Sequence, residues 1–279
     1  MSRFDVNCSI LFSELPLLER PAAARAAGFD AIELWWPWST PVPTDKEAST
    51  LAAAITDAGV ALVGLNFFAG DMAGGDRGLL SWPARAKEFQ DSIEAALAFG
   101  SDLGCRAFNA MYGNRIEGVS AEEQDEVARE NLSLVSTAAA RRDAIVLIEA
   151  LSGPQPYPLR RSGDVVAVLD AAEDAGLHNL KMLADLYHFA ANGEDPRAAI
   201  TASAARFGHV QIADAPGRHE PGTGDLDIAG LIGQLDAAGY DGWVGLEYLP
   251  SAKSEDSFGW LTELGWPPLA SGEQEGGHI

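Results

Sequence analysis

Four polar side chains stand at or near the ends of apolar segments in the second half of the chain. Glu149, Asp185 and Glu247 each close such a segment, and Gln211 lies within another. They are about one strand-helix repeat apart: 36 residues from 149 to 185, 26 from 185 to 211 and 36 from 211 to 247. In a barrel of parallel strands, side chains in these places converge at one mouth. The spacing therefore predicts a cluster of oxygen atoms.

Three carboxylates and one amide oxygen form a set of hard ligands. Carboxylates at the edge of an apolar interior are costly to keep ionised, and a divalent cation relieves both their desolvation and their mutual repulsion. Oxygen ligands suit Mg²⁺ or Mn²⁺ better than zinc. Alternatively, each carboxylate caps a helix and the glutamine bonds to backbone. That account suits any one residue alone, whereas the four together favour a metal site.

Other polar residues are expected near the same mouth. His188 and His209 each lie within three residues of a proposed ligand, and either could bind substrate or orient a ligand. Asn66 and Asn109 end two earlier predicted strands. Each could bond a substrate hydroxyl or carbonyl, although asparagine is also an ordinary turn residue.

An aromatic cluster follows two predicted strands. Trp35, Trp36 and Trp38 come after one strand, and Phe67 and Phe68 come after the next. These rings could wall the mouth against water, pack beneath a long loop or form a subunit interface, and the sequence leaves all three open.

Eight short runs of apolar and β-branched residues alternate with segments whose apolar residues recur at helical spacing. Several runs are continuously apolar, as strands buried on both faces should be. The predicted strands are Asp5–Ile10, Ala31–Leu34, Ala61–Leu65, Arg106–Met111, Ile145–Glu149, Leu180–Asp185, His209–Ala213 and Trp243–Tyr248.

The segments between the strands carry helix signals. One apolar stripe, for example, is formed by Ala128, Leu132, Val135 and Ala139. Five glycines each follow a helical segment and precede a strand, where a left-handed C-cap is wanted. They are Gly28, Gly59, Gly104, Gly176 and Gly239. This repetition indicates one recurring strand-helix unit.

Eight such units predict an α/β protein with a (β/α)8 TIM barrel. A doubly wound open sheet is the competing fold. The chain has neither a G-x-G-x-x-G after the first predicted strand nor a G-x-x-x-x-G-K-[ST] loop, which favours the barrel. We expect a single barrel domain over residues 1–265 and a loose, Pro- and Gly-rich tail over residues 266–279.

Composition narrows the classes of partner. The 279 residues suit one barrel of about 250 residues. The net charge of −22 repels phosphate backbones and anionic lipid headgroups, so we expect no nucleic acid and no membrane partner. The sequence shows no secretion signal or membrane span, which predicts a cytoplasmic protein. Cys8 and Cys105 are far apart and are predicted to be buried, reduced thiols.

Several longer motifs resemble the hydroxypyruvate isomerase family of xylose-isomerase-like TIM barrels, which includes 2-oxo-tetronate isomerases. The resemblance runs in order from Arg3 to about Trp260. The motifs are Asn7-Cys-Ser-Ile-Leu-Phe12, Ala69-Gly-Asp71, Gly75-Asp-Arg-Gly78, Glu149-Ala-Leu-Ser152, Asp185-Leu-Tyr-His188, Gly208-His-Val-Gln-Ile-Ala-Asp214, Glu220-Pro-Gly-Thr-Gly224 and Gly242-Trp-Val-Gly-Leu-Glu-Tyr248.

The resemblance implies an aldose-ketose type isomerase that interconverts hydroxypyruvate and tartronate semialdehyde. A proton would move between adjacent carbons through an enediolate, with Glu149 and Glu247 as the catalytic acid/base pair. It also implies a Mg²⁺ or Mn²⁺ ion held by Glu149, Asp185, Gln211 and Glu247, and a small oxo-acid or sugar-acid substrate. A homo-oligomer is expected on general frequency.

Two motifs depart from the hydroxypyruvate branch. The segment Glu149-Ala-Leu-Ser152 looks more like relatives that act on 2-oxo-tetronates. The family often has a lysine after the last strand where this chain has Leu249. If that lysine binds the substrate carboxylate, then Arg77, Arg218 or the metal itself must replace it.

Other functions remain open at this point. A 2-oxo-tetronate isomerase or a keto-sugar epimerase would use the same metal and glutamates, and an inosose-type dehydratase would expel a hydroxyl from the same enediolate. An apurinic endonuclease is disfavoured by the negative charge and by only five histidines. A barrel that binds a carbohydrate acid without turnover is the non-enzymatic alternative, against which both retained glutamates argue.

Overall fold

Eight parallel strands pair in chain order, and the last pairs with the first, so the sheet closes into a barrel. The computed structural model describes residues 2–265. The predicted (β/α)8 barrel is confirmed, whereas the predicted tail at residues 266–279 lies outside the described part. The strands are β1 (Arg3–Asn7), β2 (Ala31–Leu34), β3 (Ala61–Asn66), β4 (Ala107–Asn109), β5 (Ile145–Glu149), β6 (Leu180–Asp185), β7 (Phe207–Ile212) and β8 (Trp243–Leu246).

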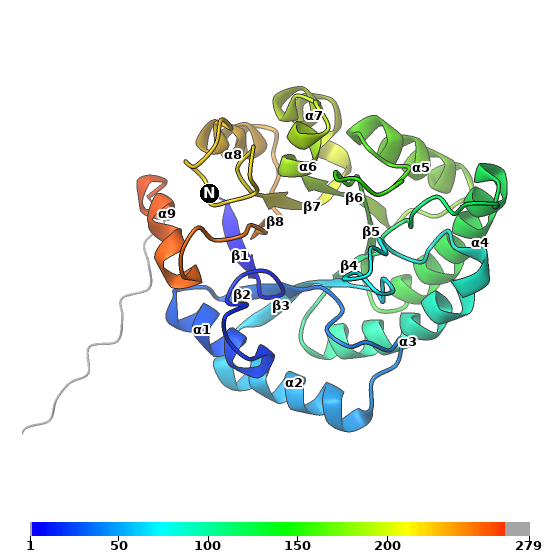
Figure 1. The fold of residues 1–279 in the computed structure, drawn as a ribbon, viewed down its shortest axis with the longest axis horizontal. Helices are drawn as coiled ribbons and strands as arrows, with labels where there is room; N and C mark the ends of the chain where they lie inside the picture. Colours follow the sequence, from blue (N-terminus) through cyan, green and yellow to red (C-terminus); the bar gives the residue numbers. More distant parts are fainter. Residues whose placement is uncertain (1, 266–279) are drawn as a thin grey trace, which may run out of the picture.

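Helices surround the strands, as the view into the barrel in Figure 1 shows. Two of them, α6 and α7, lie between β6 and β7, whereas most other connections hold one helix longer than a single turn. The helices are α1 (Arg20–Ala26), α2 (Asp45–Ala58), α3 (Ala86–Asp102), α4 (Ala121–Ala140), α5 (Ser162–Asp174), α6 (Leu186–Ala191), α7 (Pro196–Ser203), α8 (Ile228–Ala237) and α9 (Gly259–Glu263).

Three strands are predicted correctly to the residue, and the others differ at their ends. The predicted strand Asp5–Ile10 ends at Asn7, where the backbone carbonyl of Asn7 accepts the amides of Ile10 and Leu11 in a turn. The predicted strand Arg106–Met111 shrinks to Ala107–Asn109, yet Met111 is buried. Loops at this mouth are as apolar and buried as the strands, so hydrophobicity alone does not mark where pairing stops.

Helix ends carry the predicted signals. All five glycines expected at C-caps have positive φ, and Gly59 ends α2 with a φ of 68°. At the other end of α2, the Thr44 side chain accepts the amide of Glu47, and the Glu47 carboxylate accepts the amide of Thr44. Such a capping box satisfies backbone donors that the first turn leaves free.

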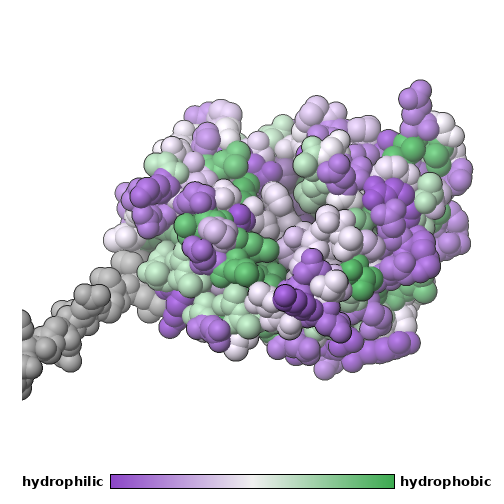
Figure 2. Space-filling view, turned by 60° about the horizontal axis from the view of Figure 1, so that its bottom comes forward, coloured by the Kyte–Doolittle hydropathy of each residue, from purple (hydrophilic) through white to green (hydrophobic). Residues whose placement is uncertain are grey.

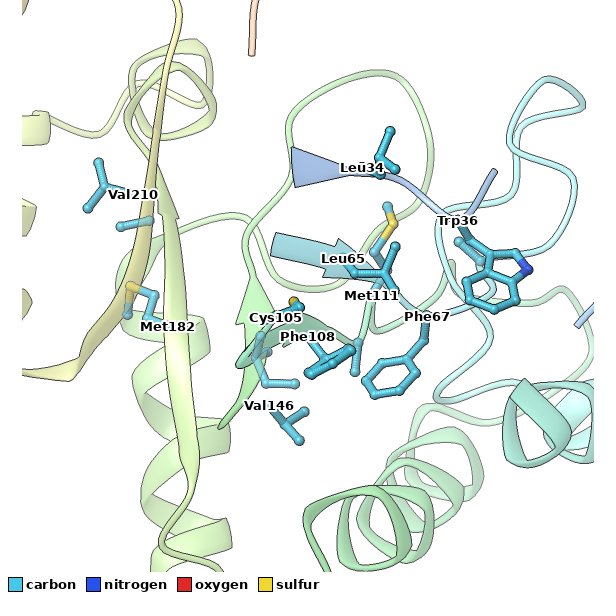
Figure 3. Close-up of a cluster of buried hydrophobic side chains, with 14 of the residues drawn as sticks. Leu34, Trp36, Leu65, Phe67, Cys105, Phe108, Met111, Val146, Met182 and Val210 are labelled. Atoms are coloured by element: carbon cyan, nitrogen blue, oxygen red, sulfur yellow. The ribbon is translucent and has the colours of Figure 1, made fainter. Parts of the chain in front are cut away.

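The largest part of the core lies between the barrel and its helices. Phe67 follows β3, and its ring lies 5.7 Å from that of Phe108 on β4 (Figure 3). The Phe67 ring also lies 5.7 Å from that of Phe89 on α3, so these rings join strand to helix. Gly100 lets α3 approach closely, because a Cβ there would lie 2.6 Å from the Phe108 ring. The predicted stripe on α4 is buried in full.

Hydrophilic side chains cover most of the face seen in Figure 2, with apolar residues in smaller patches between them. Across residues 2–265, we find no helix with the length and apolar character needed to cross a membrane.

Both cysteines are free and fully buried, as predicted. Burial raises the pKa of the Cys105 thiol to about 12 and raises the pKa of Cys8 as well. Thiols react as thiolates, whose pKa is ordinarily about 8.5.

We therefore expect the native protein to release no thionitrobenzoate from Ellman's reagent at pH 8. Unfolding in guanidinium chloride should expose both thiols and release two equivalents per chain. Rapid reaction of either cysteine in the native protein would show that its burial is incomplete.

Candidate active site

A cavity of about 490 Å³ opens at the carboxyl ends of the strands. This is the mouth at which barrel enzymes carry their chemistry. Loops that follow most of the strands supply its walls. The lining residues are Trp35, Asn66, Met72, Ala73, Arg77, Met111, Glu149, Leu151, Ser152, Gly153, Pro154, Gln155, Tyr187, His188, Arg218 and Glu247.

Glu149, the last residue of β5, is buried at the cavity floor. Its Oε2 accepts a hydrogen bond of 2.8 Å from Nδ2 of Asn109, the last residue of β4. Burial raises the pKa of Glu149 well above its usual value, and the negative charges of Glu247 and Asp185 raise it further. Glu149 therefore binds a proton readily, as a group that exchanges protons with substrate must.

Asp185 joins β6 directly to α6. Its Oδ1 caps the helix by accepting the amides of Tyr187 and His188, at 2.8 and 3.2 Å. Its Oδ2 faces the site, 3.7 Å from the Arg218 guanidinium, and has no hydrogen-bond partner among the described residues. Burial raises the pKa of Asp185 to about 7, although Arg218 opposes the rise.

Glu247 directly follows β8, and both of its carboxylate oxygens have partners. Its Oε1 accepts from Nε1 of Trp35 at 2.7 Å, from Nδ2 of Asn7 at 2.9 Å and from Nε2 of Gln211 at 3.3 Å. Its Oε2 pairs with Arg218. Burial raises the pKa of Glu247, and the positive charge of Arg218 limits the rise.

Arg218 reaches the site from the loop between β7 and α8. The backbone φ of Arg218 is 60°, in the left-handed region. The buried Asp214 holds the loop together, because its carboxylate accepts hydrogen bonds from the amides of Gly222 and Leu226. The guanidinium lies 5.3 Å from the centre of the Tyr187 ring. Although burial opposes it, the charges of the site carboxylates raise the pKa of Arg218, so this side chain keeps its positive charge.

His188 is neutral with its proton on Nε2. The Ser152 amide, which can only donate, lies 3.1 Å from Nδ1, so Nδ1 is the unprotonated nitrogen. Burial lowers the pKa of His188 well below its usual value, and the charge of Arg218 lowers it further. Nε2 lies 3.4 Å from Asp185 Oδ2 and 4.0 Å from Glu149 Oε1. In this tautomer, His188 has an N–H on Nε2 that is available as a donor at the site.

The structure places His209 deeper than the sequence analysis expected. Gln211 and His209 are two residues apart on β7, so they point the same way but lie about 6–7 Å apart along the strand. His209 borders a hollow near the starts of the strands, beside Gly208 and Trp243, and bonds to Glu33. The prediction that it lies near the mouth is therefore wrong, and its position does not favour contact with substrate.

The remaining predicted residues lie around the rim. Asn66 and Arg77 line the cavity. Arg77 donates to the carbonyls of Met72 and Asp76 and forms no ion pair within residues 2–265. Leu249 is 49% exposed and is absent from the cavity lining.

The aromatic residues after β2 have two of the roles considered for them: one ring lines the cavity, and the others pack against the rest of the protein. Trp35 lines the cavity and bonds to Glu247. Trp36 and Trp38 pack against each other, and Trp38 packs against Phe99 of α3.

Three buried polar residues at this site were missed in the sequence analysis. They are Asp5, Asn7 and Glu33, none more than 3% exposed. Glu33 gave a signal, because it is a charged residue within the otherwise apolar strand Ala31–Leu34. Charged residues are rarely buried unless they are paired.

The residues present fit a divalent cation. Ligand atoms of Glu149, Asp185 and His188 lie within 4.8 Å of one another. Asp185 Oδ2 and Gln211 Oε1 are buried and lack hydrogen-bond partners in the described part of the chain. Because Nε2 of His188 carries a proton, oxygens are the available donors, and an all-oxygen set suits Mg²⁺ or Mn²⁺.

Known proteins share this architecture. Residues 21–264 match the family model of the xylose isomerase-like TIM barrel. The chain is 56% identical over 265 residues to the putative hydroxypyruvate isomerase of Streptomyces coelicolor. This alignment covers 93% of this chain and 95% of that protein. This chain belongs to the hydroxypyruvate isomerase family. The family and the isomerase class predicted from the motifs are thereby confirmed.

Two further comparisons place the chain within this family of barrels. It is 34% identical to the 2-oxo-tetronate isomerase of Cupriavidus necator, over 94% of this chain and 98% of that protein. A solved structure described as AP endonuclease, family 2, from Brucella melitensis superposes with a TM-score of 0.85 at 32% identity, covering 94% of this chain and 99% of that one.

The raised pKa of Asp185 predicts how the stability of the metal-free isomerase depends on pH. The folded protein holds this proton more tightly than the unfolded chain, so the contribution is present below about pH 4 and is lost as pH rises through 7. Asp185→Asn keeps a neutral side chain that can still cap α6. In EDTA, its free energy of unfolding relative to wild type should increase from pH 5 to pH 7, by about 1.4 kcal/mol per pH unit, and should level off above pH 7, as measured by denaturant unfolding. Parallel pH profiles would contradict this.

Proposed function

We propose that this protein is a metal-dependent isomerase that interconverts hydroxypyruvate and tartronate semialdehyde. The observation that carries the proposal is a pair of buried glutamates, Glu149 and Glu247, that line one cavity, with the buried Asp185 at the end of a strand between theirs. They come from strands three places apart around the barrel, so a small substrate bound between them meets a carboxylate on two sides. The relatives named above support the same reaction class.

Glu149, Asp185, Gln211 and Glu247 would hold a Mg²⁺ or Mn²⁺ ion. The unpartnered oxygens of Asp185 and Gln211 support this set, because buried polar atoms ordinarily have partners. When bound, the ion would stabilise the negative charge that develops on the substrate oxygens.

The two glutamates would carry the proton between the adjacent carbons. One carboxylate removes a proton from C3 of hydroxypyruvate, and the other delivers a proton to C2, while the hydroxyl proton moves from O3 to O2. Raised pKa values suit carboxyls that must alternate between protonated and ionised forms during the reaction. His188 Nε2–H would donate to a substrate oxygen. Trp35 and Asn7 hold Glu247 in orientation.

Arginines would bind the substrate carboxylate in place of the lysine that Leu249 replaces. Arg218 already contacts two site carboxylates, whereas Arg77 lines the cavity without an ion pair in the described chain. Arg77 is thus the cation whose charge is available to an incoming anion, and we assign it the main contact with the carboxylate.

A 2-oxo-tetronate isomerase is the second candidate function. The cavity of about 490 Å³ lies within the ~300–1,000 Å³ range of pockets that hold drug-sized ligands. It therefore has room for a four-carbon sugar acid, and the same glutamates would transfer the proton. A keto-sugar epimerase would return the proton to the carbon that lost it, so product analysis separates these reactions. Binding without proton exchange would identify a carbohydrate-acid-binding module.

NMR in deuterated water tests the proposed reaction. The Mn²⁺- or Mg²⁺-loaded protein should convert hydroxypyruvate to tartronate semialdehyde with solvent deuterium on the receiving carbon, and EDTA should stop it. Glu149→Gln and Glu247→Gln should each lower turnover by roughly 10²–10⁴-fold, since amides cannot exchange protons in this way. The exposed Glu122→Gln serves as the matched control.

Wild-type turnover in either active-site variant would remove that glutamate from the mechanism. Conversion of a 2-oxo-tetronate but not of hydroxypyruvate would select the second candidate function. Deuterium uptake without a new isomer would indicate enolisation alone.

Arg77 gives a separate test of substrate binding. Arg77→Gln removes the charge but leaves the glutamates in place, so we expect KM for the oxo-acid to rise at least tenfold with a smaller change in kcat. The exposed Arg141→Gln is the matched control. An unchanged KM would show that the carboxylate binds elsewhere, and Arg218→Gln would then be the next variant to measure.

A further inference from the structure

A second group of buried charged residues lies beneath the cavity and takes no part in the reaction proposed above. Asp5 of β1, Glu33 of β2 and His209 of β7 place ligand-type atoms within 4.8 Å of one another. All three are at most 3% exposed, and the cavity lining excludes them. Within the group, Glu33 is the residue that contacts the proposed ligand Gln211.

Glu33 is the centre of this group. Its Oε1 accepts 2.6 Å from Nε2 of Gln211 and 3.0 Å from Nδ2 of Asn7, and its Oε2 bonds to Nε2 of His209 at 2.7 Å. Every one of these contacts is buried. Hydrogen bonds to a carboxylate in such surroundings are stronger than those between neutral groups.

Two glycines keep room for the Glu33 carboxylate. A Cβ on Gly245 of β8 would lie 2.9 Å from its Oε1, and one on Gly64 of β3 would lie 3.1 Å from its Oε2. Side chains at either position would push the carboxylate away from Gln211. The barrel interior is thus shaped around this one side chain.

A carboxylate decides which way a neighbouring amide points. Gln211 can present either an NH₂ donor or a carbonyl acceptor, whereas the oxygens of a carboxylate only accept. The NH₂ group therefore faces Glu33. The carbonyl oxygen, Oε1, is left buried without a hydrogen-bond partner among residues 2–265.

We propose that Glu33 is a positioning residue that fixes the Gln211 amide so that its carbonyl oxygen, and not its NH₂ group, is presented to the divalent cation. The inference rests on the proposed function, because it takes the cation set from there. Groups that orient metal ligands in this way typically change metal affinity 10–100-fold when they are lost.

Asn7 extends the same control to a second ligand. Its single Nδ2 group donates to Oε1 of Glu33 and to Oε1 of Glu247. Glu33 therefore holds Gln211 directly and Glu247 through Asn7. His209 bonds to the other Glu33 oxygen and holds the carboxylate from below.

Calorimetry with Mn²⁺ as the probe tests this role without measuring turnover. Glu33→Gln replaces an obligate acceptor with an amide that either donates or accepts, so the Gln211 amide keeps only its longer hydrogen bond, 3.3 Å to Oε1 of Glu247, as a fixed orientation. We expect Mn²⁺ to bind at least tenfold more weakly. The exposed Glu122→Gln is the matched control, because it makes the same carboxylate-to-amide change outside both buried groups, and we expect its Mn²⁺ affinity to equal that of wild type.

A donor-acceptor swap separates positioning from a merely structural role. In Glu33→Gln combined with Gln211→Glu, the new amide donates to the new carboxylate, and a carboxylate offers the same oxygen whichever way it turns. The swap should recover most of the Mn²⁺ affinity that Glu33→Gln loses. If Glu33→Gln does not fold, the swap is compared with Gln211→Glu alone. In that single variant Glu33 repels the new carboxylate, so the swap should bind Mn²⁺ more tightly than Gln211→Glu does.

The outcomes distinguish this inference from the proposed function. Weak binding by Glu33→Gln and recovery in the swap support it. Wild-type affinity in Glu33→Gln, or a swap that binds no better than its single variant, overturns the role of Glu33 alone. No Mn²⁺ binding by the wild type, or equal binding by Asp185→Asn, overturns the proposed metal site and this inference with it.

Discussion

The repulsion among carboxylates buried in one small volume is the constraint on which this site depends. Glu149, Asp185 and Glu247 share a floor where solvent screens little, and each has a raised pKa. Protons, the guanidinium of Arg218 and a bound cation are alternative ways to offset that charge. The proposed chemistry uses this competition, because a carboxyl with a raised pKa holds a proton that it can pass to a carbon atom.

Two polar layers, one above the other, distinguish this barrel from one filled only by branched apolar side chains. The upper layer faces the cavity, and the lower layer is built around Glu33 and His209. Hydrogen bonds from Gln211 and Asn7 join the layers. The upper layer is therefore held in place from within the barrel as well as by its own strands.

The sequence predicts the upper layer better than the lower one. Glu149, Asp185 and Glu247 were found because a charged residue that closes an apolar run marks a strand end, and strand ends converge in a barrel. Glu33 bonds to a residue 176 positions away, and no local pattern encodes that pairing. The same limit explains His209, whose depth depends on strand register, and the strand ends, which depend on where hydrogen bonding stops inside buried loops.

The connections around the mouth differ greatly in length. At Asp185 a strand passes into α6 without a loop, whereas long segments, residues 67–82 and 213–227, carry Arg77 and Arg218. The carboxylates thus belong to the strand ends, and the cationic side chains belong to the long connecting segments. Under the proposed function, changes in those two segments would alter which acid binds while the glutamates proposed to transfer the proton stay in place.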